Sequence, residues 1–103
     1  MKITVVKKVK ADGCLCRKSN EVWADLQASR LLGRIDRIVF AHTDKPQGEG
    51  MSLAIKHQVR VAPFFIVERE DNSEEVYTDY SHFLQEILKV GVMNQANMFE
   101  ELN

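Results

Sequence analysis

The fold is decided by residues 59–67, whose sequence is Val-Arg-Val-Ala-Pro-Phe-Phe-Ile-Val. The part from Pro63 to Val67 is predicted to form a β-strand, because a proline is followed there by an unbroken run of large apolar residues. Proline is tolerated at the first residue of a strand, where its missing N–H is not needed. Residues 51–57 predict a short helix ending near His57. This part of the chain therefore predicts a helix followed by a strand that opens at a proline.

Strand and helix patterns alternate on either side of this segment. Apolar, β-branched runs at residues 3–6 and 35–41 predict two strands. Good helix formers over residues 17–32 predict a helix between them, with Gly33 as a natural C-cap. Turn-forming residues after Val67 predict a hairpin. The chain is therefore expected to fold as an α/β protein.

The C-terminal third completes the predicted topology. Residues 74–78 predict the second arm of the hairpin, and a helix capped by Asp79 or Ser81 follows. The order is then β-α-β-α-β-β-α, in which the first two strands are parallel and the hairpin completes a four-stranded mixed sheet flanked by helices. Residues 1–91 are predicted to form this domain. Residues 92–103 carry apolar residues at i, i+3 spacing and predict a tail with a short docking helix.

Composition narrows the function classes. The chain has 103 residues, which is the length of one domain. Its formal net charge of −1 provides no excess of positive charge to bind the phosphates of a nucleic acid. No run approaches the roughly 18 apolar residues of a membrane span, and the apolar stretch near the N-terminus is too short for a signal peptide. We therefore expect a cytoplasmic protein that binds neither nucleic acid nor membrane. No cofactor is expected, and the histidines are not spaced to complete a metal site with the cysteines.

The cysteines are Cys14 and Cys16, and both lie between the first strand and the first helix. Open α/β sheets place their sites at the carboxyl ends of parallel strands, so this turn is a candidate site. Ser19 or Asn20 could cap the helix and leave the cysteines outside it, or the helix could begin at the cysteines. Cytosolic thiols stay reduced unless they are catalytic, redox-sensing or metal-bound. A redox role is therefore the leading interpretation of the pair.

Local positive charge would stabilise a thiolate in this turn. The helix dipole presents its positive end there, and Lys10 and Arg17 flank the pair. A thiolate is the nucleophile of disulfide exchange, and a second thiol can resolve the mixed disulfide. A Cys14–Cys16 bridge requires Leu15 to be turn-like or helical, and its small ring would make the bridge labile. The alternative is that Cys14 acts alone and Cys16 only starts the helix.

Three segments together resemble the thioredoxin-fold oxidoreductases, the superfamily of thioredoxins and glutaredoxins. Residues 59–65 resemble the segment that leads into the family's cis-proline. Residues 10–18, Lys-Ala-Asp-Gly-Cys-Leu-Cys-Arg-Lys, resemble the Lys-Asp-Gly-Cys-x-x-Cys-Arg segment of glutaredoxins. Residues 44–46, Asp-Lys-Pro, lie where thioredoxins have a similar loop after the second strand. The resemblance covers nearly all of the chain before the predicted tail.

The resemblance implies a thiol-disulfide oxidoreductase that acts on protein disulfides through a Cys-x-Cys pair. Cys14 would attack the partner's disulfide and Cys16 would resolve the mixed disulfide. Pro63 would be cis and would pack against the cysteine turn, and the backbone of Ala62 would pair with an extended segment of the partner. The partner would be a protein thiol or disulfide.

Four departures separate this chain from the family pattern. The spacing is Cys-x-Cys in place of Cys-x-x-Cys, and Lys8 stands where thioredoxins carry a carboxylate. Gly13 stands where they carry a tryptophan. The segment that holds glutathione in glutaredoxins is absent near residues 78–80, so glutathione is not supported as a partner. A non-catalytic binding module of the same fold is the alternative function, and a monothiol reductase of a small oxidant is a third.

Overall fold

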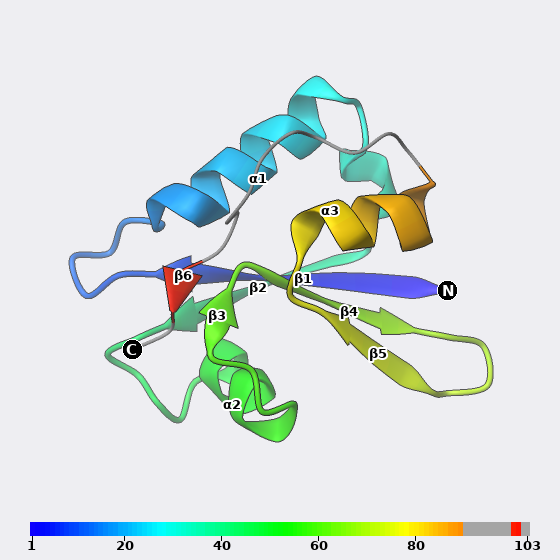
Figure 1. The fold of residues 1–103 in the computed structure, drawn as a ribbon. Helices are drawn as coiled ribbons and strands as arrows, with labels where there is room; N and C mark the ends of the chain where they lie inside the picture. The colour runs from blue at the N-terminus through cyan, green and yellow to red at the C-terminus, as the bar shows by residue number, and fades with distance from the viewer. Residues whose placement is uncertain (90–99, 102–103) are drawn as a thin grey trace.

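The computed structural model describes residues 1–89 and 100–101, and a four-stranded mixed sheet lies at its centre (Figure 1). The strand order is β2-β1-β4-β5, with β1 parallel to β2 and antiparallel to β4, and with β4 antiparallel to β5. The strands are β1 (Lys2–Val9), β2 (Arg37–His42), β4 (Phe64–Glu68) and β5 (Glu74–Tyr77). The predicted mixed sheet, with its parallel first pair and its hairpin, is confirmed.

Helices cover both faces of this sheet (Figure 1). Helices α1 (Arg17–Ala28) and α3 (Tyr80–Phe83) lie on one face, and α2 (Glu49–Lys56) lies on the other. Helix α3 continues as a π-helical turn, η2 (Leu84–Leu88), and a 3-10 turn, η1 (Leu32–Arg34), precedes β2. The predicted α/β class is thus confirmed. Within the described residues, no helix has the length and apolar character needed to cross a membrane.

Helix α1 is shorter than predicted, because it closes on a residue other than glycine. Arg30 adopts a left-handed conformation with φ of 58°, and the N–H of Leu31 donates to the carbonyl oxygen of Leu26 at 2.8 Å. This is the hydrogen-bond pattern of a Schellman motif, in which the chain turns away from the helix. Gly33, the predicted C-cap, lies in η1 instead. Of the two N-caps predicted for the last helix, Asp79 and Ser81, Asp79 is the cap, since its carboxylate accepts the N–H of His82.

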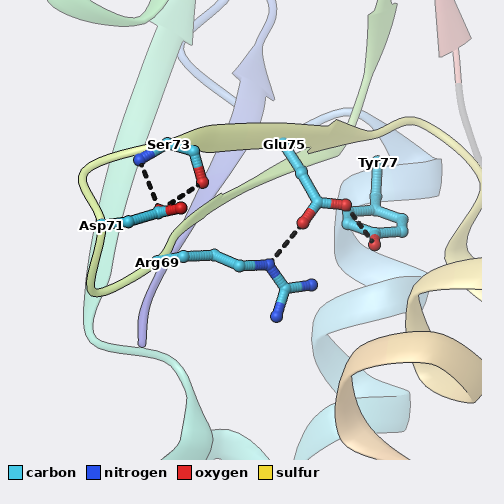
Figure 2. A network of polar contacts seen from close by, with 5 residues as sticks. All are labelled: Arg69, Asp71, Ser73, Glu75 and Tyr77. Atoms are coloured by element: carbon cyan, nitrogen blue, oxygen red, sulfur yellow. Dashed lines mark hydrogen bonds and ion pairs between the residues drawn. The ribbon is translucent and has the colours of Figure 1, made fainter.

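The β4–β5 hairpin is held at its tip by a network of polar contacts (Figure 2). The Asp71 carboxylate accepts both the N–H and the hydroxyl of Ser73, at 3.0 and 2.6 Å, which holds the pKa of Asp71 below its usual value. Glu75 accepts hydrogen bonds from Arg69 and from the Tyr77 hydroxyl, and the Arg69 bond is the main cause that lowers the pKa of Glu75. The network therefore fixes a turn at the end of the hairpin away from the core.

A second, two-stranded sheet joins β3 (Val61–Ala62) to β6 (Glu100–Glu101). Neither strand was predicted, and the predicted tail helix is wrong at Glu100 and Glu101, which form a strand. The physical reason is that β3 offers unpaired backbone groups at an edge, and a chain end can satisfy them by pairing. The rest of the predicted tail, residues 90–99 and 102–103, lies outside the described residues.

Candidate thiol site at the carboxyl end of β1

A tight hairpin after β1 carries the first cysteine. Val9 and Leu15 form an antiparallel bridge, and the N–H of Lys10 donates to the carbonyl oxygen of Cys14 at 2.8 Å. Between these two residues lies a three-residue loop, whose last member, Gly13, has φ of +87°. Such a loop commonly ends in a residue with positive φ, which glycine adopts without a steric penalty. The glycine therefore returns the chain toward β1 and places Cys14 on the return arm.

Cys14 is exposed, and its backbone is bound to the loop. Its N–H donates to Oδ1 of Asp12 at 2.9 Å, and this bond is the largest of the effects that lower the pKa of Asp12. The ammonium of Lys10 lies 3.8 Å from the other carboxylate oxygen and acts in the same direction. Asp12 therefore stays ionised and orders the backbone that presents the Cys14 thiol to solvent.

Cys16 is fully buried and forms the N-cap of α1. Its N–H donates to the carbonyl oxygen of Lys8 at 3.0 Å, which ties the start of the helix to β1. Its sulfur accepts the N–H of Ser19 at 3.4 Å, the role that a side-chain oxygen usually has at this position. Of the two helix starts left open by the sequence, the one at the cysteines is therefore correct, and neither Ser19 nor Asn20 is the cap.

Ser19 links the buried thiol to β1, and the sequence reasoning considered it only as a cap. Its hydroxyl oxygen accepts the Cys16 thiol hydrogen, with 3.2 Å between sulfur and oxygen, and also accepts the N–H of Lys8 at 3.0 Å. Ser19 is itself buried. Because a hydroxyl can both donate and accept, the same residue can serve the thiol and the thiolate forms of Cys16. The three-residue spacing from the helix cap was the signal that could have identified it.

The two cations predicted to stabilise a thiolate each lie beside a carboxylate. Lys10 lies against Asp12, as described above, and Nε of Arg17 lies 3.5 Å from Oε1 of Glu21 one turn along α1. Both cations are at least half exposed, so solvent screens their charge. Their effect on the thiols stays a prediction.

Pro63 and Ala62 lie at the same end of β1 as the cysteines. The Ala62–Pro63 peptide bond is cis, as the resemblance implied. Phe64, the next residue, pairs with Val6, and the hydrogen bond from Cys16 reaches Lys8 two residues further along β1. The strand register therefore brings the proline segment and the start of α1 to one end of the sheet.

The two thiols are free, and the backbone between them is engaged elsewhere. Leu15 is held in its bridge with Val9, and bridged residues have extended backbone. A Cys14–Cys16 disulfide was predicted to need a turn-like or helical Leu15. To close the bond, the chain would therefore first have to release the contact between Leu15 and Val9.

A buried lysine lies on the α1 face of the same strand. The side chain of Lys7 is covered by α1, with its ammonium 3.9 Å from the centre of the Trp23 ring, and burial lowers its pKa. Attraction between an ammonium and an aromatic face offsets part of the desolvation cost. Trp23 itself packs against the core on this face.

No protein-family model, curated protein or solved structure matches this chain. In the part of the chain that the structure describes, no group of three or more histidine, cysteine or acidic side chains is arranged to hold a metal ion. The functional assignment therefore depends on the geometry of the thiols and of the β3 edge at the same end of the sheet.

Proposed function

We propose that the protein is a thiol-disulfide oxidoreductase of the thioredoxin type that acts on protein disulfides. Cys14, as a thiolate, attacks one sulfur of the partner's disulfide, and the other partner sulfur leaves as a thiolate. Cys16 then attacks the Cys14 sulfur and releases the first partner sulfur. The partner gains two electrons and the two protons that the protein thiols lose. A thiol reductant must afterwards return both electrons to the Cys14–Cys16 disulfide.

The difference in burial between the two cysteines carries this proposal. Cys14 is exposed at a loop, whereas Cys16 is fully buried and capped into α1. A large partner can reach only the first sulfur, so the mixed disulfide forms at Cys14. A buried second thiol is protected from the partner and becomes a nucleophile only toward a sulfur that is delivered beside it. This division of roles is what a two-step exchange needs.

Ser19 acts as a positioning residue in this scheme. In the resting thiol form it accepts the Cys16 hydrogen. When Cys16 loses that proton, the Ser19 hydroxyl can rotate and donate to the sulfur while still accepting the Lys8 N–H. The thiolate would then have two donors, this hydroxyl and the Ser19 N–H. These two contacts would hold the Cys16 sulfur in place for its attack on the Cys14 sulfur.

The finer fold assignment, a thioredoxin-like domain, belongs to this proposal as well. It is supported by the strand order, by the placement of α1 and α3 opposite α2, and by the turn at the end of β1. In this assignment the backbone of Ala62 pairs with an extended segment of the partner and holds its disulfide over Cys14.

The test is a trapping experiment with insulin as a generic protein disulfide. In a Cys16→Ser variant the mixed disulfide at Cys14 cannot be resolved, so a covalent adduct should accumulate on a non-reducing gel. The Cys14→Ser variant is the matched control and should give no adduct, because the remaining thiol is buried. Wild-type protein should reduce insulin without accumulating the adduct. Absence of an adduct in the Cys16→Ser variant contradicts the proposal.

A redox titration tests whether the pair itself cycles. Wild-type protein is equilibrated with mixtures of reduced and oxidised glutathione, and mass spectrometry follows the loss of two hydrogens that an internal disulfide causes. We expect an internal disulfide to appear at oxidising ratios, once Leu15 leaves its bridge with Val9. If the bond forms at no ratio, the dithiol mechanism is wrong and Cys14 acts alone.

A second candidate function is a non-catalytic binding module of the same fold. It is favoured by the pairing of β3 with β6, which uses backbone groups and no thiol. A hollow beside this edge could receive a partner's side chains, and it is lined by Ala54, Ile55, Gln58, Val59 and Arg60. A Cys14→Ser/Cys16→Ser variant separates the two functions. A binding module keeps its affinity for partner peptides in this variant, whereas an oxidoreductase loses all exchange activity.

A further inference from the structure

The backbone edge assigned above to a partner is already paired within this chain. Strand β6 runs antiparallel to β3, with Ala62 opposite Glu100 and Val61 opposite Glu101 (Figure 1). This pairing joins residues that are about 40 positions apart in the sequence, so it is a tertiary contact rather than a local turn. The β3 edge is therefore occupied by a later segment of the same chain, β6.

Pairing at a strand edge excludes a second chain from the same edge. Each backbone N–H and C=O that points out of an edge forms its ladder bond with one neighbouring strand. A partner that adds to Ala62 and a β6 strand that adds to Ala62 therefore compete for the same groups. Since β6 belongs to the same chain, its binding is intramolecular, and a free partner competes against a high effective concentration.

We propose that β6 is an intramolecular pseudo-substrate strand that closes the β3 edge and must leave before a partner's extended segment can bind. This inference rests on the proposed function, because it assigns regulation to the β3 edge, which lies at the same end of the sheet as the thiols. The exposed Cys14 thiol is not itself part of the β3–β6 pairing. Small disulfides therefore reach Cys14 whether or not β6 is in place, whereas extended peptides react only after it leaves.

The chemistry of the occupant suits this edge. Its described residues, Glu100 and Glu101, are both acidic, and the exposed Arg60 directly precedes β3 in the sequence. Charge complementarity can steer the association of a segment with an edge, but exposed charges add little to its affinity. Backbone pairing is therefore the main force that holds β6, and charge is secondary.

The experiment compares two double variants of the tail. Glu100→Pro/Glu101→Pro removes both N–H donors of β6 and cannot form the ladder. Glu100→Gln/Glu101→Gln removes the charges but keeps the backbone, and is the matched control. Each protein is reacted with hydroxyethyl disulfide, which has no peptide backbone, and with a short unstructured peptide dimerised through a cysteine disulfide. The readout is the rate at which Cys14 becomes a mixed disulfide.

If β6 covers the edge for about nine-tenths of the time, the proline variant should react about tenfold faster than wild type with the peptide disulfide. Its rate with hydroxyethyl disulfide should not change, and the glutamine variant should match wild type with both probes. An unchanged peptide rate in the proline variant overturns the inference. So does an equal acceleration with both probes, because it would place the effect at Cys14 rather than at the strand edge.

Amide hydrogen exchange tests the occupancy of the edge without any thiol chemistry. The peptide that contains Val61 and Ala62 should exchange faster in the proline variant than in the glutamine variant, while exchange in β1 and β4 should be the same. Equal exchange at β3 overturns the inference even if the thiols are active. If exchange differs as expected but Cys14 reacts with neither probe, the occupied edge is upheld and the oxidoreductase function is wrong.

Discussion

The two faces of the sheet are packed by different kinds of residues. Toward α1 and α3 the core is built around aromatic rings, with Phe65 and Phe83 stacked at 3.9 Å between ring centroids and with Tyr80 beside them. Toward α2 the core includes small residues, among them Ala41 and Ala54. The face toward α1 and α3, the bulky face, therefore contains stacked aromatic rings, whereas on the other, close-packed face, which also holds Phe64 and Ile66, α2 approaches the backbone of β2 closely at Gly50.

This difference shows how the two parts of the candidate site, the cysteines before α1 and the β3 edge, are positioned. The face toward α1 and α3 anchors α1, whose N-cap, Cys16, is the buried thiol. The close-packed face anchors α2, which is joined to β3 by residues 57–60. In this link the N–H of Val59 donates to the carbonyl oxygen of Ala54 at 2.8 Å. Substitutions on the first face should therefore act mainly on stability, and those on the second face should also move the strand edge.

The largest expected effect is the loss of an aromatic ring from the bulky face. Phe83→Ala should lower the free energy of unfolding by about 3–5 kcal/mol, since Phe83 is fully buried and leaves a cavity against Phe65. Urea unfolding followed by circular dichroism gives the value. The control is Ile55→Ala on α2, an exposed position where the change should stay within about 0.5 kcal/mol. Similar losses for both variants would contradict the contrast between the faces.

A smaller effect is expected from a methyl group on the close-packed face. In Gly50→Ala the new Cβ would collide with backbone atoms of Phe40 and Ala41, so α2 must move away from β2. Overpacking of this kind should cost about 1–3 kcal/mol. Gly33→Ala is the matched control, because no atom lies within 4 Å of its added Cβ. It should leave stability unchanged or raise it by up to about 1 kcal/mol.

The Gly50→Ala variant also tests whether α2 positions the edge of β3. In Gly50→Ala, amide exchange at Val61 and Ala62 should be faster than in wild type, because β3 follows α2 directly. Phe83→Ala should not change exchange at β3 beyond its effect on global unfolding. If Gly50→Ala and Phe83→Ala speed amide exchange at β3 equally, packing on the α2 face has no special effect on the β3 edge.

The next effect concerns a polar contact at the rim of the bulky face. The Tyr80 hydroxyl donates to the Asp25 carboxylate at 2.5 Å, and Tyr80→Phe should cost roughly 1–2 kcal/mol near neutral pH. Burial, and secondarily Asp25, raise the pKa of Tyr80 well above its usual value. The unfolded chain therefore loses the phenol proton first, from about pH 10 upward, where the folded protein still holds it.

This linkage predicts how the difference between wild type and Tyr80→Phe depends on pH. The stabilising contribution of Tyr80 is fully present below about pH 10 and falls by up to about 1.4 kcal/mol for each pH unit above it. Measuring both proteins from pH 7 to pH 11 cancels the titration of Tyr77 and Lys7, whose pKa values are also shifted. A constant difference over this range would contradict the prediction.

The smallest expected effect is at Ser19, which links Cys16 at the start of α1 to β1. Ser19→Ala removes the acceptor of the Lys8 N–H and of the Cys16 thiol, and should cost about 1 kcal/mol. Ser52→Ala, at an exposed position of α2, is the control and should stay within about 0.5 kcal/mol. The more specific readout is the resolving step with insulin. It should slow in Ser19→Ala, while the attack by Cys14 keeps its rate.

Much of the architecture could be predicted from local patterns. Apolar runs identified the four strands of the central sheet, and helical periodicity identified α1. Capping residues placed the start of α3 at Asp79 or Ser81, and Asp79 is the cap. The end of α1 was missed, because Arg30 takes the left-handed position for which glycine is the usual residue. Cys16 as a cap was only one of two readings, since sulfur is an uncommon acceptor at that position.

The amino-acid sequence by itself determined which segments form the four strands of the central sheet and the helices that cover it, and that two thiols lie in the turn after the first strand. These properties follow from periodicity and turn chemistry, which act between near neighbours in the chain. The tertiary structure alone decided that one thiol is buried and the other exposed, that Ser19 bridges Cys16 to β1, and that β6 pairs with β3. Each of these depends on contacts between residues that only packing and backbone pairing bring together, such as those between Ser19 and β1 and between β6 and β3.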